Sequence, residues 1–182
     1  EPGQTVAVFG LGGVGLAAVM GAKLAGAGRV IAIDPVEHKR ALALEIGADD
    51  ALEGGPGTVE ELKAMTDGGP GRVIETAGSA KVLETAYLAT RRGGITVTVG
   101  LPNPEAMLSI PAVSIVAEER TLKGSYLGSA NPREMLPQLF DYWRAGKLPV
   151  EKLISGRLKL DEINEGFDRL ASGEAVRQII VL

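Results

Sequence analysis

Three glycines early in the chain have the spacing that a phosphate-binding turn requires. Gly10, Gly12 and Gly15 form a GxGxxG pattern within "VAVFGLGGVGLAAVM", between a β-branched run and small apolar residues at helical spacing. In such a turn the first glycine permits the bend from strand to helix, the second lets the backbone approach a pyrophosphate, and the third lets the helix pack on the strand. The phosphates then face the positive end of the helix dipole. Because 25 of the 182 residues are glycine, the spacing alone is also compatible with a nucleotide-free turn.

A carboxylate follows these glycines at the distance typical of a dinucleotide site. Asp34 stands nineteen residues after Gly15, at the end of the apolar run "VIAI". A carboxylate at this position accepts hydrogen bonds from the adenosine ribose and repels a 2′-phosphate, which favours NAD over NADP. The alternative is that Asp34 only caps the helix that follows Pro35, and both roles are compatible. Together with the flanking strands and helix, the glycines and Asp34 predict dinucleotide binding.

Strands and helices alternate regularly through the first part of the chain. Apolar runs predict strands at 5–9, 29–33, 49–52, 72–77, 93–100 and 121–127, and helical patterns fall at 14–24, 36–46, 58–66 and 80–89. We expect Thr58 and Glu61 to form a capping box on the third helix and Ser79 to cap the fourth. Such alternation with continuous Val and Ile strands indicates an α/β fold, with a doubly wound, six-stranded parallel sheet of the Rossmann type.

The pattern changes after about residue 102. The rest of the chain suggests a helix at 132–145, an extended segment at 153–160, a helix begun by Asp161 and a strand-like tail at 177–182. Two helices and two isolated strands do not make a second core. We therefore expect an NAD-binding domain at 1–128 and an appendage at 129–182 that packs on another part of a longer protein. The start without a methionine agrees with a piece of a longer polypeptide.

Composition argues against several classes of partner. The net charge is −4, from 19 basic and 23 acidic residues, and no basic stripe is present, so nucleic acid is not expected as a partner. No apolar run reaches the roughly 20 residues of a membrane span and no leader precedes the first strand, so we expect a cytoplasmic protein. Cysteine is absent, and the single histidine, His38, is expected to be a solvated surface residue. Zinc would find almost no ligands in this chain.

Four segments of the chain resemble the zinc-dependent medium-chain alcohol dehydrogenases, most closely the branch that includes the glutathione-dependent formaldehyde dehydrogenases. They are "PGQTVAVFGLGGVGLAAVMGAKLAGAGRVIAID", "RRGGITVTVGLP", "ERTLKGSYLG" and "DEINEGFDRLASGEAVRQIIVL". The resemblance implies hydride transfer from an alcohol, or a hydroxymethyl adduct, to NAD, giving an aldehyde-level product. It also implies that the zinc ligands precede the coenzyme domain. This chain alone is then expected to bind NAD, to hold no zinc and to catalyse nothing.

The resemblance assigns coenzyme contacts to particular residues. The pyrophosphate turn would comprise Gly10, Gly12, Gly13, Val14 and Gly15. Arg177 would bind the same phosphates through its planar fork. The ribose would be held by Asp34 and by Lys39, for which a solvated lysine is the alternative. Thr76 and Ala77 would lie beside the coenzyme. The backbone of four residues at strand ends would hold the nicotinamide carboxamide, unless they are only core: Val99, Leu101, Ser125 and Leu127.

The resemblance also implies contacts outside the coenzyme site. Region 106–117 matches the segment through which dimers of the family join, so we expect a homodimer there, with a buried edge strand of one subunit as the alternative. Some apolar side chains of the appendage would lose partners, which predicts an exposed apolar patch or a non-native contact; they belong to the set Leu136, Leu139, Phe140, Trp143 and Phe167.

Two other functions remain open. One is a regulatory module that binds NAD without chemistry. The other is a zinc-free relative of the quinone reductases, which usually prefer NADPH and lack an acid at the position of Asp34. The sequence that precedes residue 1 in the whole protein would separate these possibilities.

Overall fold

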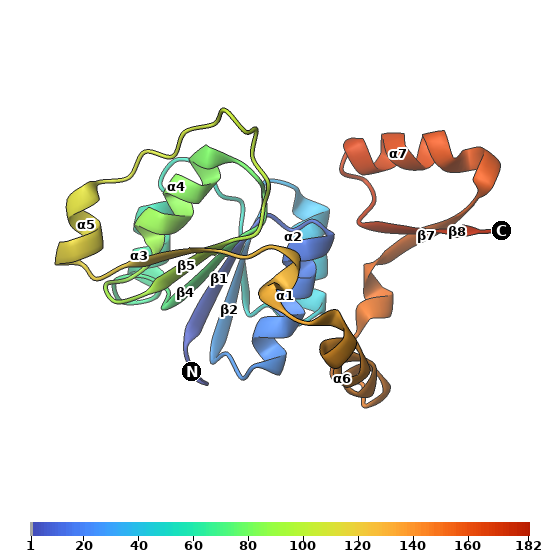
Figure 1. Cartoon of the computed structure of the whole chain (residues 1–182), viewed down its shortest axis with the longest axis horizontal. Helices are drawn as coiled ribbons and strands as arrows, with labels where there is room; N and C mark the ends of the chain where they lie inside the picture. Colours follow the sequence, from blue (N-terminus) through green and yellow to red (C-terminus); the bar gives the residue numbers. More distant parts are fainter. Residues whose placement is uncertain (1) are drawn as a thin grey trace.

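Six parallel strands form the central sheet of the molecule (Figure 1). The computed structural model describes residues 2–182. The strand order is β3-β2-β1-β4-β5-β6, so the direction of winding reverses between β1 and β4. The strands are β1 (Thr5–Phe9), β2 (Arg29–Ile33), β3 (Asp50–Leu52), β4 (Arg72–Glu75), β5 (Ile95–Thr98) and β6 (Thr121–Gly124). This order is that of the doubly wound Rossmann fold, so the predicted fold is confirmed.

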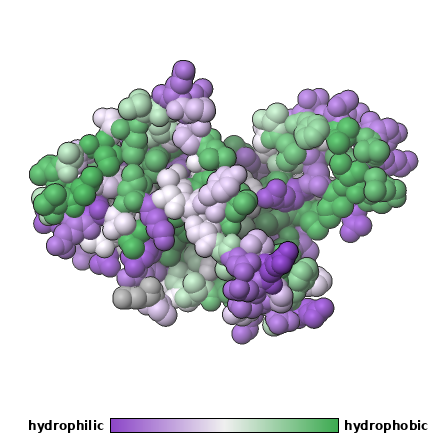
Figure 2. Space-filling model, in the orientation of Figure 1, coloured by the Kyte–Doolittle hydropathy of each residue, from purple (hydrophilic) through white to green (hydrophobic). Residues whose placement is uncertain are grey.

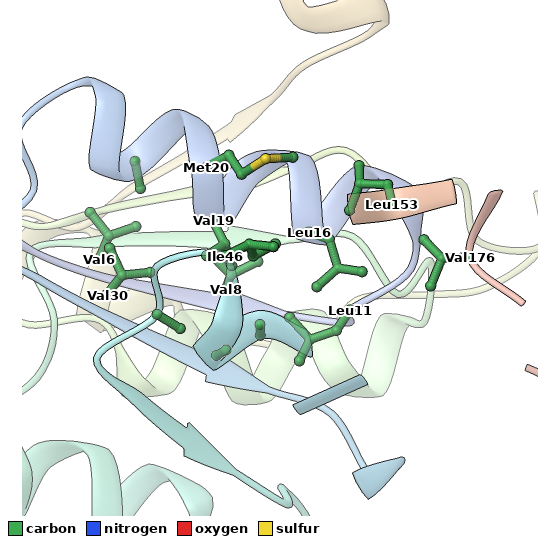
Figure 3. Close-up of a cluster of buried hydrophobic side chains, with 14 of the residues drawn as sticks. Val6, Val8, Leu11, Leu16, Val19, Met20, Val30, Ile46, Leu153 and Val176 are labelled. Atoms are coloured by element: carbon green, nitrogen blue, oxygen red, sulfur yellow. The ribbon is translucent and has the colours of Figure 1, made fainter. Parts of the chain in front are cut away.

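Helices cover the two faces of this sheet because its crossovers run in opposite directions from β1. They are α1 (Gly13–Leu24), α2 (Glu37–Glu45), α3 (Thr58–Met65) and α4 (Ala80–Ala89), whereas the short helix α5 (Ala112–Ala117) buries only Ser114. Side chains of a strand alternate between faces. Val8 and Val30 therefore pack with α1 and α2 in one buried cluster (Figure 3), whereas Phe9 and Ile31 pack with α3 and α4 in another. Burial on both faces accounts for the continuous apolar strands in the sequence.

Two helix starts differ from the prediction. The capping box of Thr58 and Glu61 does not form, because Gly57, in the left-handed conformation with φ 89°, is the N-cap of α3. Thr58 is thereby the first helical residue, and its hydroxyl donates to the carbonyl of Gly55 at 2.7 Å. Ser79 does occupy the N-cap position of α4, but its side chain makes no capping hydrogen bond.

The region from 102 to 131 contains less strand than expected. β6 ends at Gly124, and a 3-10 turn, η1 (Leu127–Ser129), follows with all three residues at positive φ, which no strand can accommodate. In region 106–117 the regular element is the helix α5, so the alternative of an edge strand is wrong. Met107 and Val116 are more than 80% exposed on this segment. A dimer through it stays a prediction.

The C-terminal segment forms a small unit beside the sheet (Figure 1). Its elements are α6 (Pro132–Arg144), η2 (Val150–Leu153), β7 (Ile154–Lys159), η3 (Leu160–Glu162), α7 (Ile163–Ala171) and β8 (Arg177–Val181). The expected isolated strands are in fact paired: β7 and β8 run parallel to each other, with η3 and α7 as the crossover. The last helix accordingly begins at Ile163 rather than at Asp161, which lies in η3.

This C-terminal unit is docked on the main core but leaves much apolar surface exposed. Leu148, Leu153 and Val176 join the buried cluster on the α1 side of the sheet, and Figure 3 shows the last two beside Leu16. Figure 2 shows apolar side chains gathered on the surface of the unit. Of the expected patch, Leu139 packs against the core, whereas four residues are more than 40% exposed: Leu136, Phe140, Trp143 and Phe167. No helix within residues 2–182 is long and apolar enough to cross a bilayer.

Candidate functional site

Five strand ends line up along one edge of the sheet. The register pairs Phe9 with Ile33 and Glu75, and continues through Thr98 to Gly124. The residues that follow these ends therefore stand in one row, which runs Asp34, Gly10, Thr76, Val99 and Ser125. At about 4.8 Å per strand, the row is about 19 Å long. It lies outside the carboxyl ends of the strands, across the point where the winding reverses, which is where open α/β sheets bind ligands.

The glycine turn at the centre of this row is tightly packed on one side. Gly10 has φ 85°, a conformation that favours glycine. A Cβ on Gly15 would stand 1.7 Å from the carbonyl oxygen of Gly10, so only glycine fits there. The Thr76 hydroxyl donates to that same carbonyl at 2.7 Å. Thr76, predicted as a coenzyme contact, thus fixes the turn from the neighbouring strand.

The other side of the turn is open. Gly12 is the N-cap of α1 and makes no side-chain cap, and a Cβ added to it would meet no atom within 4 Å. The first amides of a helix have no acceptor within the helix. The N–H groups of Gly13, Val14 and Gly15 are therefore available to a ligand, and the Val14 side chain is 49% exposed. A ligand can therefore reach the backbone N–H groups of the turn from this side.

A guanidinium from the C-terminal unit lies against this open turn. Arg177, the first residue of β8, approaches so closely that a Cβ on Gly13 would stand 2.6 Å from its Nε atom. Its side chain makes no hydrogen bond or ion pair with any residue in 2–182, and the residue is exposed. A guanidinium and a helix N-terminus, both positive, thus meet, and no carboxylate among residues 2–182 pairs with the guanidinium. Phosphate oxygens satisfy both groups at once.

Asp34 is buried beside the turn, and both of its carboxylate oxygens are held. Oδ2 accepts from the amide of Leu11 at 2.7 Å, and Oδ1 accepts from the amide of Val36 at 2.8 Å. Since Val36 is the N-cap of α2, the alternative that Asp34 caps this helix is wrong. A carboxylate has about four acceptor sites, so Asp34 retains capacity for ribose hydroxyls.

The start of α2 also contacts the C-terminal unit. Lys39 Nζ would lie 3.3 Å from a Cβ on Gly173, the residue that follows the C-cap of α7. His38 Nε2 is 3.1 Å from the carbonyl oxygen of Gly173. His38 is exposed, as expected, but it is not merely solvated. Through Lys39 and Arg177, the C-terminal unit thus contacts the start of α2 and the glycine turn.

The opposite end of the row, at β5 and β6, is more open. The Val99 amide donates to the carbonyl of Glu75 at 2.8 Å, and the Ser125 amide donates to that of Thr98 at 2.9 Å. Leu101 and Leu127 are 78% and 79% exposed, so the alternative that these two are core residues is wrong. Ala77 is exposed, and its backbone borders Gly10.

One buried acid in the row is absent from the sequence-based prediction. Glu75, at the end of β4, is 1% exposed. Its Oε1 accepts from the Gly78 amide at 2.8 Å, and its Oε2 accepts from the Thr98 hydroxyl at 2.7 Å. It thereby ties the end of β4 to the loop after it and to β5. The signal in the sequence is an acidic residue that directly follows the apolar pair Val73 and Ile74, in "RVIE".

The described residues do not fit a zinc site. Within 2–182, no group of three or more His, Cys, Asp or Glu side chains is arranged to hold a metal ion. The single histidine is engaged with Gly173, and the chain contains no cysteine.

Comparisons with known proteins agree with this geometry. Residues 13–142 match a family model described as zinc-binding dehydrogenase. The chain is 40% identical to the geraniol dehydrogenase of Castellaniella defragrans over 182 residues, which cover 99% of this chain and 48% of that protein. Two solved structures superpose closely. The alcohol dehydrogenase zinc-binding domain protein of Burkholderia ambifaria has a TM-score of 0.95 at 31% identity, over 100% of this chain and 49% of its own.

The second solved structure is the benzyl alcohol dehydrogenase of Acinetobacter calcoaceticus, with a TM-score of 0.94 at 29% identity. The match covers 99% of this chain and 50% of that one. The chain thus spans about half the length of the relatives it matches.

Proposed function

The chain belongs to the zinc-binding dehydrogenase family, and we propose that it forms the NAD-binding part of an alcohol dehydrogenase. In the whole protein, an alcohol would transfer a hydride to NAD⁺ and release its hydroxyl proton, which gives NADH and an aldehyde-level product. The relatives support an alcohol as substrate, since those named above are dehydrogenases of geraniol and benzyl alcohol. Residues 1–128 would hold the coenzyme, and residues 129–182 would also pack against the remainder of the protein.

The single observation that carries this proposal is the position of Arg177 against Gly13. The guanidinium is supplied by the last strand of the chain and the helix N-terminus by its first crossover, yet they converge, and no carboxylate within residues 2–182 pairs with the guanidinium. The pyrophosphate of a dinucleotide would bind between the free amides of α1 and the fork of Arg177.

The adenosine end supports NAD rather than NADP. The Asp34 carboxylate is fixed by the amides of Leu11 and Val36, so it stands ready to accept from the ribose hydroxyls and repels a 2′-phosphate. The presence of this acid argues against the alternative of a quinone-reductase-like protein, which would usually lack an acid at the position of Asp34. The alternative of a module that only senses NAD would gain support if the whole protein bound NAD but oxidised no alcohol.

The chain's own residues supply binding and orientation. The glycine turn and Arg177 would hold the phosphates, Asp34 and Lys39 the ribose, and the row from Thr76 to Leu127 the nicotinamide end. NAD supplies the hydride acceptor when bound. Because the described residues do not fit zinc, we propose that residues 1–182 alone bind coenzyme without turning over an alcohol.

Titration of the chain with NAD⁺ in a calorimeter, with native and variant proteins side by side, tests the proposal. Arg177→Ala removes charge-assisted hydrogen bonds of about 1.5–3 kcal/mol, so the Kd for NAD⁺ should rise about 10-fold to 100-fold. Arg92→Ala is the matched control, since Arg92 is exposed before β5 at the opposite edge of the sheet. Equal effects of the two substitutions, or no NAD⁺ binding by the native chain, would contradict the proposal.

A further inference from the structure

A buried carboxylate joins the two loops that follow β4 and β5. Glu75 is 1% exposed, and its Oε1 accepts from the amide of Gly78, in the loop after β4, at 2.8 Å. Its Oε2 accepts from the hydroxyl of Thr98, the last residue of β5, at 2.7 Å. The main-chain carbonyl of Glu75 also accepts from the amide of Val99 at 2.8 Å. Through these three oxygens, one residue holds both loops.

The two loops contact each other through their backbones. A Cβ on Gly100 would stand 2.2 Å from the amide nitrogen of Gly78, and a Cβ on Gly78 would stand 3.1 Å from the carbonyl oxygen of Leu101. Gly78 has φ 70°, a conformation that favours glycine. Because neither glycine has a side chain that could absorb a movement, a shift of Gly78 must also shift Gly100 and Leu101.

The charge on Glu75 is not required by the stability of the fold alone. Within residues 2–182 no lysine or arginine forms an ion pair with this carboxylate. A buried charge without a counter-charge costs stability that an apolar residue of similar volume would not cost. The hydrogen bonds from Gly78 and Thr98 offset that cost, and the feature that they fix is the path of the two loops.

We propose that Glu75 is a positioning residue for the nicotinamide end of the coenzyme. It would act through the backbone of Val99 and Leu101, whose positions it sets, and it does not reach the ligand itself because it is buried. The inference rests on the proposed function, in which the row from Thr76 to Leu127 holds the nicotinamide end. A carboxamide carries both donors and an acceptor, so backbone groups bind it only when their positions match both. Glu75 fixes those positions before the coenzyme arrives.

The next residue, Thr76, serves the other half of the coenzyme site. Its hydroxyl donates to the carbonyl of Gly10 in the glycine turn after β1, which lies on the opposite side of β4 from β5. Loss of the Thr76 hydroxyl should therefore weaken binding of every ligand that carries the pyrophosphate. Loss of the Glu75 carboxylate should weaken binding only of ligands that also carry the nicotinamide.

Calorimetric titration with NADH and with ADP-ribose isolates the nicotinamide end, because the two ligands share the ADP-ribose moiety and the same net charge. We expect the native chain to bind NADH about tenfold more tightly, the range of one or two hydrogen bonds to the carboxamide. Glu75→Ala should nearly abolish this preference, since it should weaken NADH binding about tenfold and ADP-ribose binding less than about threefold. Glu75→Gln should retain the preference, because its side chain keeps an acceptor for the Gly78 amide and can donate to the Thr98 oxygen.

Substitutions of three threonines separate positioning from a general loss of stability. Thr98→Val removes the hydroxyl that is bonded to Glu75 and should lower the NADH preference about threefold. Thr96→Val is the matched control, because the buried Thr96 hydroxyl bonds to Thr90 at 2.7 Å on the same strand and sheet face as Thr98. It should lower the melting temperature and leave the preference unchanged. Thr76→Val should weaken binding of both ligands equally.

Each titration is made below the melting transition of its variant, and Thr98→Val decides if Glu75→Ala does not fold. A native chain that binds NADH no more tightly than ADP-ribose would overturn the inference, as would a native preference in the deciding variant. The same loss of preference in Thr96→Val or Thr76→Val would also overturn it. Intact NAD⁺ binding with any of these results overturns this inference alone. Failure of the native chain to bind NAD⁺ overturns the proposed function and this inference with it.

Discussion

The polar side chains at the two edges of the central sheet differ in how deeply they are buried. At the carboxyl edge, Asp34, Glu75 and Thr76 are bonded to backbone groups of neighbouring segments over 2.7–2.8 Å, and the two acids are buried. At the amino edge, Lys23 pairs with Asp49, which also accepts from the Val30 amide at 2.7 Å, and Arg29 pairs with Asp50, with 30–40% of each side chain exposed.

The difference is therefore one of burial: the acids at the carboxyl edge are shielded from water, whereas the ion pairs at the amino edge are partly exposed to it. A carboxylate that is held by fixed backbone amides keeps one position before any ligand arrives, whereas an exposed ion pair exchanges its partners with water and contributes little. Pre-organised, buried polar groups are typical of binding sites. The carboxyl edge therefore has the properties of the ligand site, quite apart from the resemblance to known dehydrogenases.

Among the substitutions considered, Gly15→Ala should disrupt the carboxyl edge most, in both stability and NAD⁺ binding. Its methyl group would stand 1.7 Å from the Gly10 carbonyl and 2.8 Å from the Thr76 hydroxyl, so the turn and α1 must separate. We expect a loss of about 3 kcal/mol or more in the free energy of unfolding, at the upper end of overpacking effects, together with loss of NAD⁺ binding. Urea denaturation and calorimetric titration measure the two.

Gly12→Ala is the matched control for that substitution. Gly12 has φ −75° and open space around it, so the methyl group should change stability by less than about 0.5 kcal/mol. The same methyl group would occupy the side from which phosphates approach, so NAD⁺ binding should weaken at least tenfold. A Gly12→Ala protein that binds NAD⁺ as the native chain does would show that the open side of the turn is not the phosphate site.

Glu75→Ala should cause the next largest loss in the free energy of unfolding. The substitution leaves the Gly78 amide and the Thr98 hydroxyl without their buried acceptor and opens a cavity, at a cost of about 2–4 kcal/mol. Glu75→Gln should cost less, because its oxygen can still accept from Gly78 while the Thr98 hydroxyl turns to accept from its amide. Asp50→Ala, at the amino edge, should cost less than about 1 kcal/mol. Similar urea midpoints for Glu75→Ala and Asp50→Ala would show that polar groups at the two edges contribute equally to stability.

Much of the carboxyl edge follows from local sequence patterns. The bounds of β1 and β2 are those predicted, because continuous runs of Val, Ala and Ile end at Gly10 and Asp34. Gly15 and Asp34 follow from the spacing of a known turn. The capping box of Thr58 failed for an equally local reason, since Gly57 can adopt a conformation that displaces the helix start by one residue.

Contacts between distant segments could not be read from such patterns. The pairing of β7 with β8 joins residues 154–159 to 177–181, and no turn signal connects them. Glu75 is a site residue only because the register places Thr98 beside it. Arg177 was expected at the phosphates through family resemblance alone, since by itself it is one charged residue before a strand.

The smallest predicted effect on the free energy of unfolding is that of Asp49 at the amino edge, and it should depend on pH. Burial raises the pKa of Asp49, but the hydrogen bond from the Val30 amide and the Lys23 ammonium outweigh it and hold that pKa below its ordinary value. A lowered pKa in the folded state gives stability that is present above the ordinary value of about 3.9 and is lost as pH falls through the lower value.

Because the Asp49 side chain is 40% exposed, solvent screening should limit this contribution to a few tenths of a kcal/mol. Asp49→Asn should therefore lower the free energy of unfolding by that amount at pH 7, since its amide oxygen can still accept from Val30. The native and variant curves from urea denaturation should converge as pH falls below 4, and 0.5 M NaCl should narrow the gap at pH 7. A gap above about 1.5 kcal/mol at pH 7 would show that the amino edge is held as firmly as the carboxyl edge, and exposure would then no longer distinguish the site from the rest of the sheet.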